Sequence, residues 1–275
     1  MKIQYLGTAA YDAIPSPFCH CDTCLRAKKL GGRNIRTRTQ SIINDDLLID
    51  FNPDTVCHFL HYNIDWDKID NCLITHSHED HLYVEDDMLI PRFGYQPHRV
   101  RYYSGKSGYD IIMAGMHKFP IMLEKDLARV SLVEPYKEFT AGGYRILPVR
   151  AQHDPLSSPV LYAIERDGKR LLYGNDSGYF YEDAIEALKG FGRFDLVSFD
   201  CTGALNPDNW RKDHMGFVTV RELADRLMRE GIMDEKTIKV LNHFSHNGLA
   251  NYDELAGPAE EMGYVVSYDG MTVEF

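Results

Sequence analysis

The chain has 275 residues, of which 44% are hydrophobic and 26% are charged, and its formal net charge is −11. This length is sufficient to bury a sizeable hydrophobic core without disulfides. The acidic balance argues against a nucleic-acid polymer as partner, because no basic surplus exists to displace counterions. A small anionic substrate remains compatible with it, because bound metals can supply positive charge locally.

The first segment, Met1–Thr8, alternates polar and apolar residues like a β-strand and is too short and polar for a signal peptide. No stretch approaches the roughly 18 uninterrupted apolar residues that a membrane span requires. We therefore expect a cytoplasmic protein with no membrane contact, in which thiols stay reduced. Six cysteines are present, and three of them fall within six residues, which indicates a metal site.

Strand-like and helical patterns follow one another along the whole chain, with turn signals such as Asn44–Asp46 between neighbouring strands. The predicted strands are Ile3–Leu6, Ser41–Ile43, Leu47–Asp50, Cys72–Ile74, Val100–Tyr103, Tyr144–Val149, Val160–Glu165, Arg170–Tyr173, Leu196–Phe199, Ile238–Leu241 and Val265–Tyr268. The predicted helices are Thr55–Tyr62, Gly108–His117, Tyr181–Gly190, Val218–Glu230 and Tyr252–Met262.

In the fourth of these helices, Thr219 and Glu222 have the spacing of a capping box. No linker of low complexity divides the chain, and each half opens with hairpin-like strands and closes with helices. We therefore predict a single α/β domain over residues 1–275, built as a four-layer αββα sandwich.

The stretch Thr75–His81 places three imidazoles and a carboxylate directly after the apolar run Cys72–Ile74. Imidazole and carboxylate ligands together suit zinc, manganese or iron better than calcium or magnesium. A histidine-rich solvent loop is the alternative, but so tight a cluster behind a buried-looking strand favours a metal site. The candidate ligands in this motif are His76, His78, Asp80 and His81.

Further candidates lie at strand ends downstream. A hydrolytic two-metal site needs about six or seven ligands, usually from distant parts of the chain. His153, Asp176 and His243 each follow a predicted strand. Asp50 ends another predicted strand, where it could orient a ligating imidazole from behind.

This order of residues resembles the metallo-β-lactamase superfamily over nearly the whole chain. The resemblance implies a dinuclear site in which His76, His78 and His153 hold one metal, Asp80, His81 and His243 hold the other, and Asp176 bridges the pair. A water shared by two dications loses its proton near neutral pH instead of at about 15.7. That hydroxide would be the nucleophile, so no serine or cysteine nucleophile is required.

A second metal site is indicated by three cysteines in a predicted loop at about residues 19–24, namely Cys19, Cys21 and Cys24. Structural zinc takes four ligands and accepts three thiolates with one imidazole. His246 is the predicted fourth ligand, whereas His20 is a rival whose cysteine neighbours would strain the geometry. A disulfide or solvent-facing thiols are the alternatives. Such a zinc would tie this loop to the C-terminal loop and hold His243 in place.

The cysteine loop, the His-x-x-His pair and the ending Tyr268–Met271 together resemble the phosphodiesterase accessory to carbon–phosphorus lyase. That family cleaves phosphoribosyl cyclic phosphate. The protein associated with pyrroloquinoline quinone synthesis shares part of the pattern. The resemblance therefore implies a phosphodiesterase acting on a small cyclic or nucleotide-like phosphodiester.

Cleavage of such a diester requires a proton for the leaving alkoxide. His214 is the candidate donor, because it lies between a predicted strand and a helix, and the phosphodiesterase family has a catalytic histidine in the same place. A surface histidine at a helix start is the alternative. Asp80 is counted with His214 among the catalytic residues.

Arg33, Arg36 and Arg38 form a basic cluster, in which Arg38 is the candidate for substrate contact because guanidinium groups bind phosphate in a bidentate manner. A solvated charged face is the alternative for this cluster. The remaining histidines His58, His61, His98 and His117 are interpreted as ordinary surface or core groups.

The segment of about residues 82–120 departs from the superfamily pattern, and we interpret it as a substrate-shaping insertion. Two other functions remain open on this scaffold: hydrolysis of a thioester or lactone, and a non-catalytic accessory role in cofactor biosynthesis. A homodimer is possible. We expect two divalent ions of zinc, manganese or iron at the active site and one structural zinc.

Overall fold

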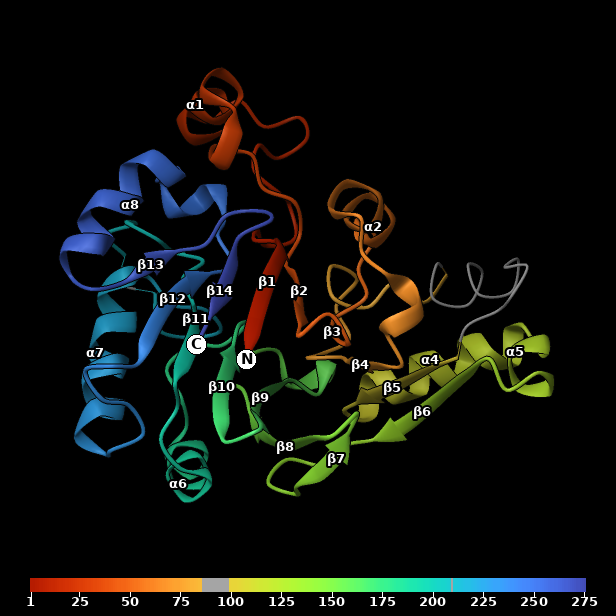
Figure 1. Cartoon of the computed structure of the whole chain (residues 1–275). Coiled ribbons are helices and arrows are strands. Elements are labelled where there is room, and N and C mark those ends of the chain that lie inside the picture. Colours follow the sequence, from red (N-terminus) through yellow and green to blue (C-terminus); the bar gives the residue numbers. More distant parts are fainter. Residues whose placement is uncertain (86–98, 209) are drawn as a thin grey trace.

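The computed structural model describes residues 1–85, 99–208 and 210–275. In these residues two seven-stranded sheets pack face to face (Figure 1). The first sheet has the order β14 (Thr272–Glu274), β1 (Lys2–Gly7), β2 (Gln40–Ile43), β3 (Leu47–Ile49), β4 (Asn71–Leu73), β5 (Val100–Ser104) and β6 (Ala128–Leu132). The second has the order β13 (Val265–Val266), β12 (Ile238–Asn242), β11 (Leu196–Asp200), β10 (Lys169–Gly174), β9 (Val160–Arg166), β8 (Tyr144–Arg150) and β7 (Phe139–Ala141).

Each sheet combines an antiparallel part with a parallel part. In the first sheet β14, β1, β2 and β3 pair antiparallel, whereas β3 to β6 are parallel. In the second sheet β7 to β10 are antiparallel, whereas β10 to β13 are parallel. Because parallel strands end at the same edge of a sheet, the residues that follow β3 and β4 emerge together. Those that follow β10, β11 and β12 do likewise.

Helices cover the outer faces of both sheets and complete the four layers. The described helices are α1 (Asp22–Leu30), α2 (Thr55–Tyr62), α4 (Lys106–Lys118), α5 (Ile121–Glu124), α6 (Glu182–Phe191), α7 (Phe217–Arg229) and α8 (Tyr252–Glu261). Ile112 and Met122, from α4 and α5, are buried against the first sheet. Leu188, Leu223 and Leu255, from α6, α7 and α8, are buried against the second. The predicted αββα sandwich is therefore confirmed.

The layer between the sheets contains large side chains from both. Tyr5 and Ile49 of the first sheet meet Tyr162, Tyr173 and Leu196 of the second, and all five are fully buried. Burying an aliphatic or aromatic side chain of this size contributes about 1.5–3 kcal/mol. This core fixes the two sheets against each other and thereby the positions of their strand ends.

All predicted strands and the five predicted helices are present, with ends shifted by one or two residues in several of them. Helices α1 and α5 and strands β6, β7 and β14 were not predicted. The predicted capping box at Thr219 is wrong, because α7 begins at Phe217, whose burial together with Val220 extends the helix towards its N-terminus. The capping box of the described chain involves Asn251 and Glu254 in α8.

Part of the segment at residues 82–120 belongs to the sandwich itself, because β5 lies between β4 and β6 in the first sheet and α4 packs beside them. Residues 86–98 of this segment lie outside the described residues, so a substrate-shaping role stays a prediction. Within the described part of the chain, no helix combines the length and apolar character that crossing a membrane would require.

Candidate metal centre

The residues of the predicted metal site follow strand ends at the edge shared by the two sheets. Asp50 follows β3, Asp176 follows β10 and His243 follows β12. Each of these three has a positive φ, of 66°, 54° and 63° respectively, which is uncommon for residues other than glycine. Such left-handed residues tend to occur at functional sites, where the surrounding structure enforces them. Here they turn the chain sharply as it leaves the sheet.

Three histidines form the first cluster, as predicted. The Nδ1 atom of His78 lies 3.0 Å from Nε2 of His76 and 3.2 Å from Nε2 of His153. His76 and His78 come from the segment after β4, whereas His153 follows β8 in the other sheet. Three imidazole nitrogens so close together can share one cation as ligands.

The second cluster is built around the carboxylate of Asp176. One of its oxygens, Oδ2, lies 3.1 Å from Nε2 of His81, and the other, Oδ1, lies 3.0 Å from Nε2 of His243. Asp80 Oδ2 lies 3.3 Å from the same nitrogen of His81. Donor atoms of His76, His81 and Asp176 also lie within 4.8 Å of one another, so the two clusters adjoin. The structure thus brings together all seven predicted ligands.

Several donor atoms of the two clusters are buried without a hydrogen-bond partner, and a bound metal would supply the missing partner. His81 Nε2, Asp176 Oδ2 and His243 Nε2 are in this state, because the close contacts between these imidazoles and the carboxylate do not have hydrogen-bond geometry. Leaving buried polar atoms unpaired costs about 1–3 kcal/mol each. Because carboxylate oxygens face imidazole nitrogens here, a pair of dications would satisfy both at once. The residues present therefore fit a dinuclear centre.

The charges of the site shift its pKa values in opposite directions. Burial would lower the pKa of His81, but Asp176, Asp80 and Asp50 together raise it well above the usual value. Burial would raise the pKa of Asp176, but His243 and His81 hold it well below the usual value. This cluster therefore concentrates ionised carboxylates and attracts positive charge.

The ring nitrogen that faces away from the cluster is hydrogen-bonded in every candidate histidine, which fixes the tautomer and ring orientation. Asp50, as predicted, accepts from Nδ1 of His81 over 2.7 Å. The other partners were not predicted: Thr75 Oγ1 for His76 at 3.0 Å, Asp154 Oδ2 for His78 at 3.3 Å, the carbonyl of Asp213 for His153 at 3.1 Å and Thr202 Oγ1 for His243 at 2.8 Å. Thr75 directly precedes His76 in the sequence motif, whereas the partners of His78, His153 and His243 lie 76, 60 and 41 residues away and are brought near only by the fold.

His214 lies beside this cluster, and its ring centroid is 4.9 Å from that of His153 and 5.4 Å from that of His243. Its Nδ1 atom donates to Oδ2 of Asp200 over 2.9 Å. Asp200 was not predicted as a site residue, although it ends β11 in the manner in which Asp50 follows β3. Its position at a strand end was the signal that could have found it.

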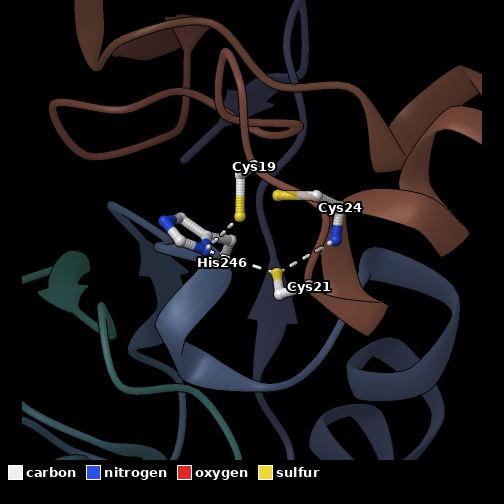
Figure 2. Close-up of side chains that lie close together, drawn as sticks. All are labelled: Cys19, Cys21, Cys24 and His246. Carbon is white, nitrogen blue, oxygen red and sulfur yellow. Dashed lines mark hydrogen bonds between the residues drawn. The ribbon is translucent and has the colours of Figure 1, made fainter.

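Three cysteines and His246 form a separate group, as predicted (Figure 2). The Nδ1 atom of His246 lies 3.7 Å from Sγ of Cys19 and 3.5 Å from Sγ of Cys21. Sulfur atoms and this nitrogen all lie within 4.8 Å of one another, and all three cysteines are free thiols. His246, not His20, completes the group, and its four donors are those that structural zinc accepts.

The cysteines are not all in a loop, which corrects the prediction. Cys21 is the N-cap of α1, its Sγ accepts from the backbone N–H of Cys24 at 3.5 Å, and Cys24 lies in the first turn. Such N–H groups favour negative charge at a helix N-terminus. Although burial opposes it, hydrogen bonds from Cys24 and His246 lower the pKa of Cys21 to about 6. Cys21 is therefore prepared to act as a thiolate ligand.

The three arginines of the predicted basic cluster have different surroundings, although Arg33 and Arg36 both lie near the ring of Tyr252, with Cζ at 5.3 Å and 5.9 Å from its centroid. Arg38 donates to Asp54 over 2.9 Å and to the carbonyl of Tyr11 over 3.0 Å, so its contact with substrate stays a prediction. Arg36 is 3% exposed and lies 4.1 Å from the ring centroid of Phe244. The alternative of a solvated charged face is therefore wrong for Arg36.

Comparison with known proteins agrees with this architecture. The chain is 26% identical to an octanoyltransferase of Porphyromonas gingivalis over 278 aligned positions, which cover 96% of this chain and 50% of that relative. The chain thus spans about half the length of the curated relative it matches.

Solved structures with similar folds include a diphosphatase from the PhnP family, with a TM-score of 0.74, 20% identity and coverage of 100% of this chain and 98% of that one. They also include Zn²⁺-bound PqqB from Methylobacterium extorquens, with a TM-score of 0.75, 20% identity and full coverage of both chains. The beta-lactamase superfamily domain matches residues 47–244 of this chain. With this match and this fold, the chain belongs to the metallo-β-lactamase superfamily.

Proposed function

We propose that the protein is a dinuclear metal-dependent hydrolase that cleaves a small cyclic or nucleotide-like phosphodiester. The observation that carries this proposal is the position of His214, which lies against the histidine–aspartate cluster and is held there by buried Asp200. A metal cluster alone would support many hydrolyses. A histidine that is hydrogen-bonded to a carboxylate, placed beside the cluster, suits a reaction whose leaving group needs a proton.

Two dications held by the seven ligands would supply an ionised water as nucleophile and neutralise the phosphoryl oxygens. In the proposed reaction a bond forms between the water oxygen and phosphorus, and the bond from phosphorus to the leaving oxygen breaks. His214 gives its Nε2 proton to that leaving oxygen. Asp200 holds the imidazole by its Nδ1 atom and stabilises its protonated form, because it raises the pKa of His214 to about 9 against the effect of burial.

Two further observations support a phosphate ester as substrate. One neighbour in fold is a diphosphatase of the PhnP family, whose substrate class also carries phosphorus. The net charge of −11 gives a long polyanion no overall electrostatic attraction, so a small molecule that reaches the metal centre is the better match. Phosphoribosyl cyclic phosphate is the specific candidate that follows from the cysteine loop and the C-terminal motif.

The test is turnover of bis(4-nitrophenyl) phosphate and of a five-membered cyclic phosphodiester by metal-free protein reloaded with manganese, zinc or iron. We expect turnover that depends on added metal and is absent in Asp176→Ala. If no diester is turned over with any of these metals, although both metal positions are filled, a non-catalytic accessory role would be favoured instead.

A second candidate function is hydrolysis of an acyl thioester. The match to half of an octanoyltransferase favours it, because that relative is named for an eight-carbon acyl group. The same nucleophile would serve, but a thiolate leaves with little help from an acid, since free thiols have a pKa of about 8.5. Octanoyl thioester turnover that exceeds diester turnover and survives in His214→Ala would establish this alternative.

A further inference from the structure

A chain of hydrogen bonds connects the C-terminal segment to the residue that orients His81. It begins at Asp269 Oδ2, which lies 2.7 Å from Thr37 Oγ1. Thr37 Oγ1 lies 2.7 Å from Nε2 of His58, and Nδ1 of His58 lies 2.7 Å from Oε1 of Gln40. The amide nitrogen of Gln40 then donates to the backbone carbonyl of Asp50 over 2.9 Å.

The orientation of the Gln40 amide determines which ring nitrogen of His58 carries a proton. Gln40 Nε2 uses both of its hydrogens, one on the carbonyl of Asp50 and the other on Thr55 Oγ1 at 2.9 Å. Thr55 Oγ1 must accept, because its own proton goes to the carbonyl of Asn52 at 2.7 Å. Oε1 of Gln40 therefore faces His58 as an acceptor, and Nδ1 of His58 must donate.

The hydroxyl of Thr37 then lies between two groups that cannot both be acceptors. It has one proton, yet it is 2.7 Å from both Asp269 and His58. If Asp269 is ionised, His58 must donate from both ring nitrogens and is a cation. If His58 is neutral, Asp269 must be protonated. In either arrangement the pair holds one proton more than a carboxylate and a neutral imidazole.

The surroundings of the pair act on the pKa of Asp269 in opposite directions. Thr8 donates to Asp269 Oδ1 over 2.6 Å, because its own oxygen accepts from Arg36 at 2.7 Å. The N–H of Thr37, 2.6 Å from Oδ2 of Asp269, and the hydroxyl of Thr8 lower the pKa of Asp269, but the larger effect of burial raises it. Burial also lowers the pKa of His58, to about 4. The other groups that act on the pair electrostatically are Arg36, Asp54, His61 and Tyr62.

The network is also accessible from outside. Thr37, His58 and Asp269 contribute to the lining of a groove of about 710 Å³ beside α2, together with residues such as Tyr62 and Ile35. Protons can therefore exchange with solvent although His58 is only 2% exposed.

Asp50 needs support from its surroundings, because it is a non-glycine residue with a φ of 66°. Its carboxylate accepts from the N–H of Thr75 at 2.8 Å and from Nδ1 of His81 at 2.7 Å, whereas its carbonyl accepts from Gln40. We propose that His58, through the proton shared with Asp269 across Thr37, is a positioning residue that fixes Gln40 against Asp50 and so sets the orientation of His81 for metal binding. This inference rests on the proposed metal centre.

Loss of the shared proton has a defined consequence. Thr37 can then donate to only one neighbour, so one of the two 2.7 Å contacts must lengthen. If the contact to His58 lengthens, the ring still donates from Nδ1 to Gln40 but is no longer held at Nε2, so the donor to the carbonyl of Asp50 is less rigidly fixed. Metal binding at the cluster should weaken, whereas the cysteine site should be unaffected.

The test compares Thr37→Val, which removes the hydroxyl at nearly constant volume, with the matched control Thr37→Ser, which keeps it. Metal affinity of the active centre is measured by competition with a chromophoric zinc chelator from pH 6 to pH 9. At pH 6 we expect Thr37→Val to bind zinc about tenfold more weakly than the wild type, and Thr37→Ser to bind it like the wild type. A tenfold loss is the lower end of the effects seen when a residue that hydrogen-bonds to a metal ligand is replaced. The difference should shrink as the pH rises and the wild type loses its proton.

Equal affinities of Thr37→Val and the wild type at pH 6 would overturn the positioning role, whereas failure of the wild type to bind metal at this cluster would overturn the proposed function instead. A second measurement does not depend on these variants. Nitrogen NMR of the metal-free wild type, with the His58 ring assigned by its absence in His58→Ala, should show a proton on Nδ1. A ring protonated on Nε2 alone would contradict the inference.

Discussion

Asp200 accepts a hydrogen bond from Nδ1 of His214 over 2.9 Å while it is completely buried. Its other oxygen accepts from the N–H groups of Thr202 and Met215, each at 3.0 Å. A carboxylate held this firmly stays in place, and it acts on the imidazoles of His214 and His243, whose Nδ1 atoms lie 2.9 Å and 3.6 Å from its Oδ2. The hydrogen bond therefore holds the His214 ring in one orientation, as its proposed role as an acid requires.

Replacing His214 by glutamine should reduce kcat on a phosphodiester with a poor leaving group by about 100- to 10,000-fold, the usual contribution of a positioned acid. Diesters that release 4-nitrophenolate should lose much less, because that leaving group needs no proton. Steady-state kinetics on both kinds of substrate, with metal content measured in parallel, would show this. Equal losses on both substrates would contradict the role of His214.

The pH profile should carry the signature of the same pair. His214 must be protonated to act as an acid, so kcat/KM should fall as the pH rises through its pKa, which Asp200 raises to about 9. The alkaline limb of the pH profile should lie near or below this value, because bound dications disfavour the protonated form of His214 and so lower its pKa. In Asp200→Asn the negative charge is lost, and the limb should move to lower pH. If the alkaline limb is unchanged in this variant, Asp200 does not set the pKa of the catalytic acid.

Replacing Asp176 by alanine should remove the carboxylate that faces both His81 and His243. We expect wild-type protein to hold three metals per chain and the variant to hold one, at the cysteine group. Elemental analysis after dialysis would measure this. Asp183→Ala is a suitable control, because Asp183 is an exposed carboxylate on α6 paired with Arg150.

Replacing Cys21 by serine should release the metal held by the cysteine group and leave the two others in place. A ligand present at 100 times its dissociation constant stabilises a fold by about 2.7 kcal/mol, so a loss of at least this size is expected in the free energy of unfolding. Chemical denaturation at fixed zinc would report it. Cys57→Ser, at an exposed cysteine on α2, should change neither stability nor metal content.

Tyr162 connects the two sheets directly before the histidine motif, because its hydroxyl donates to the carbonyl of Ile74 over 2.8 Å. Tyr162→Phe should cost about 1–2 kcal/mol of stability, since a buried acceptor loses its donor. Tyr11→Phe, at a tyrosine that is 56% exposed, should have almost no effect. Denaturation midpoints of the two variants provide the comparison.

Much of this architecture could be predicted from local patterns. The strands β1 to β5 and β8 to β12 carry runs of apolar residues that only a sheet interior can bury, and turn residues separate them. The short strands β6, β7 and β14 escaped prediction because their burial is partial and their pairing is supplied by neighbours. Helix α1 escaped because its cysteines were interpreted only as ligands.

The sequence by itself determined the identity of the donor atoms, since imidazole, carboxylate and thiolate groups at strand ends and in a tight cluster restrict both the metals and the chemistry. Only the tertiary structure decided which atoms face each other. Asp200, Thr202 and Asp154 lie 14, 41 and 76 residues from the histidines they contact, and no sequence spacing links these pairs. The same holds for the network from Asp269 to Asp50. Their roles arise from hydrogen bonds of about 3 Å, and such distances exist only after the two sheets have packed.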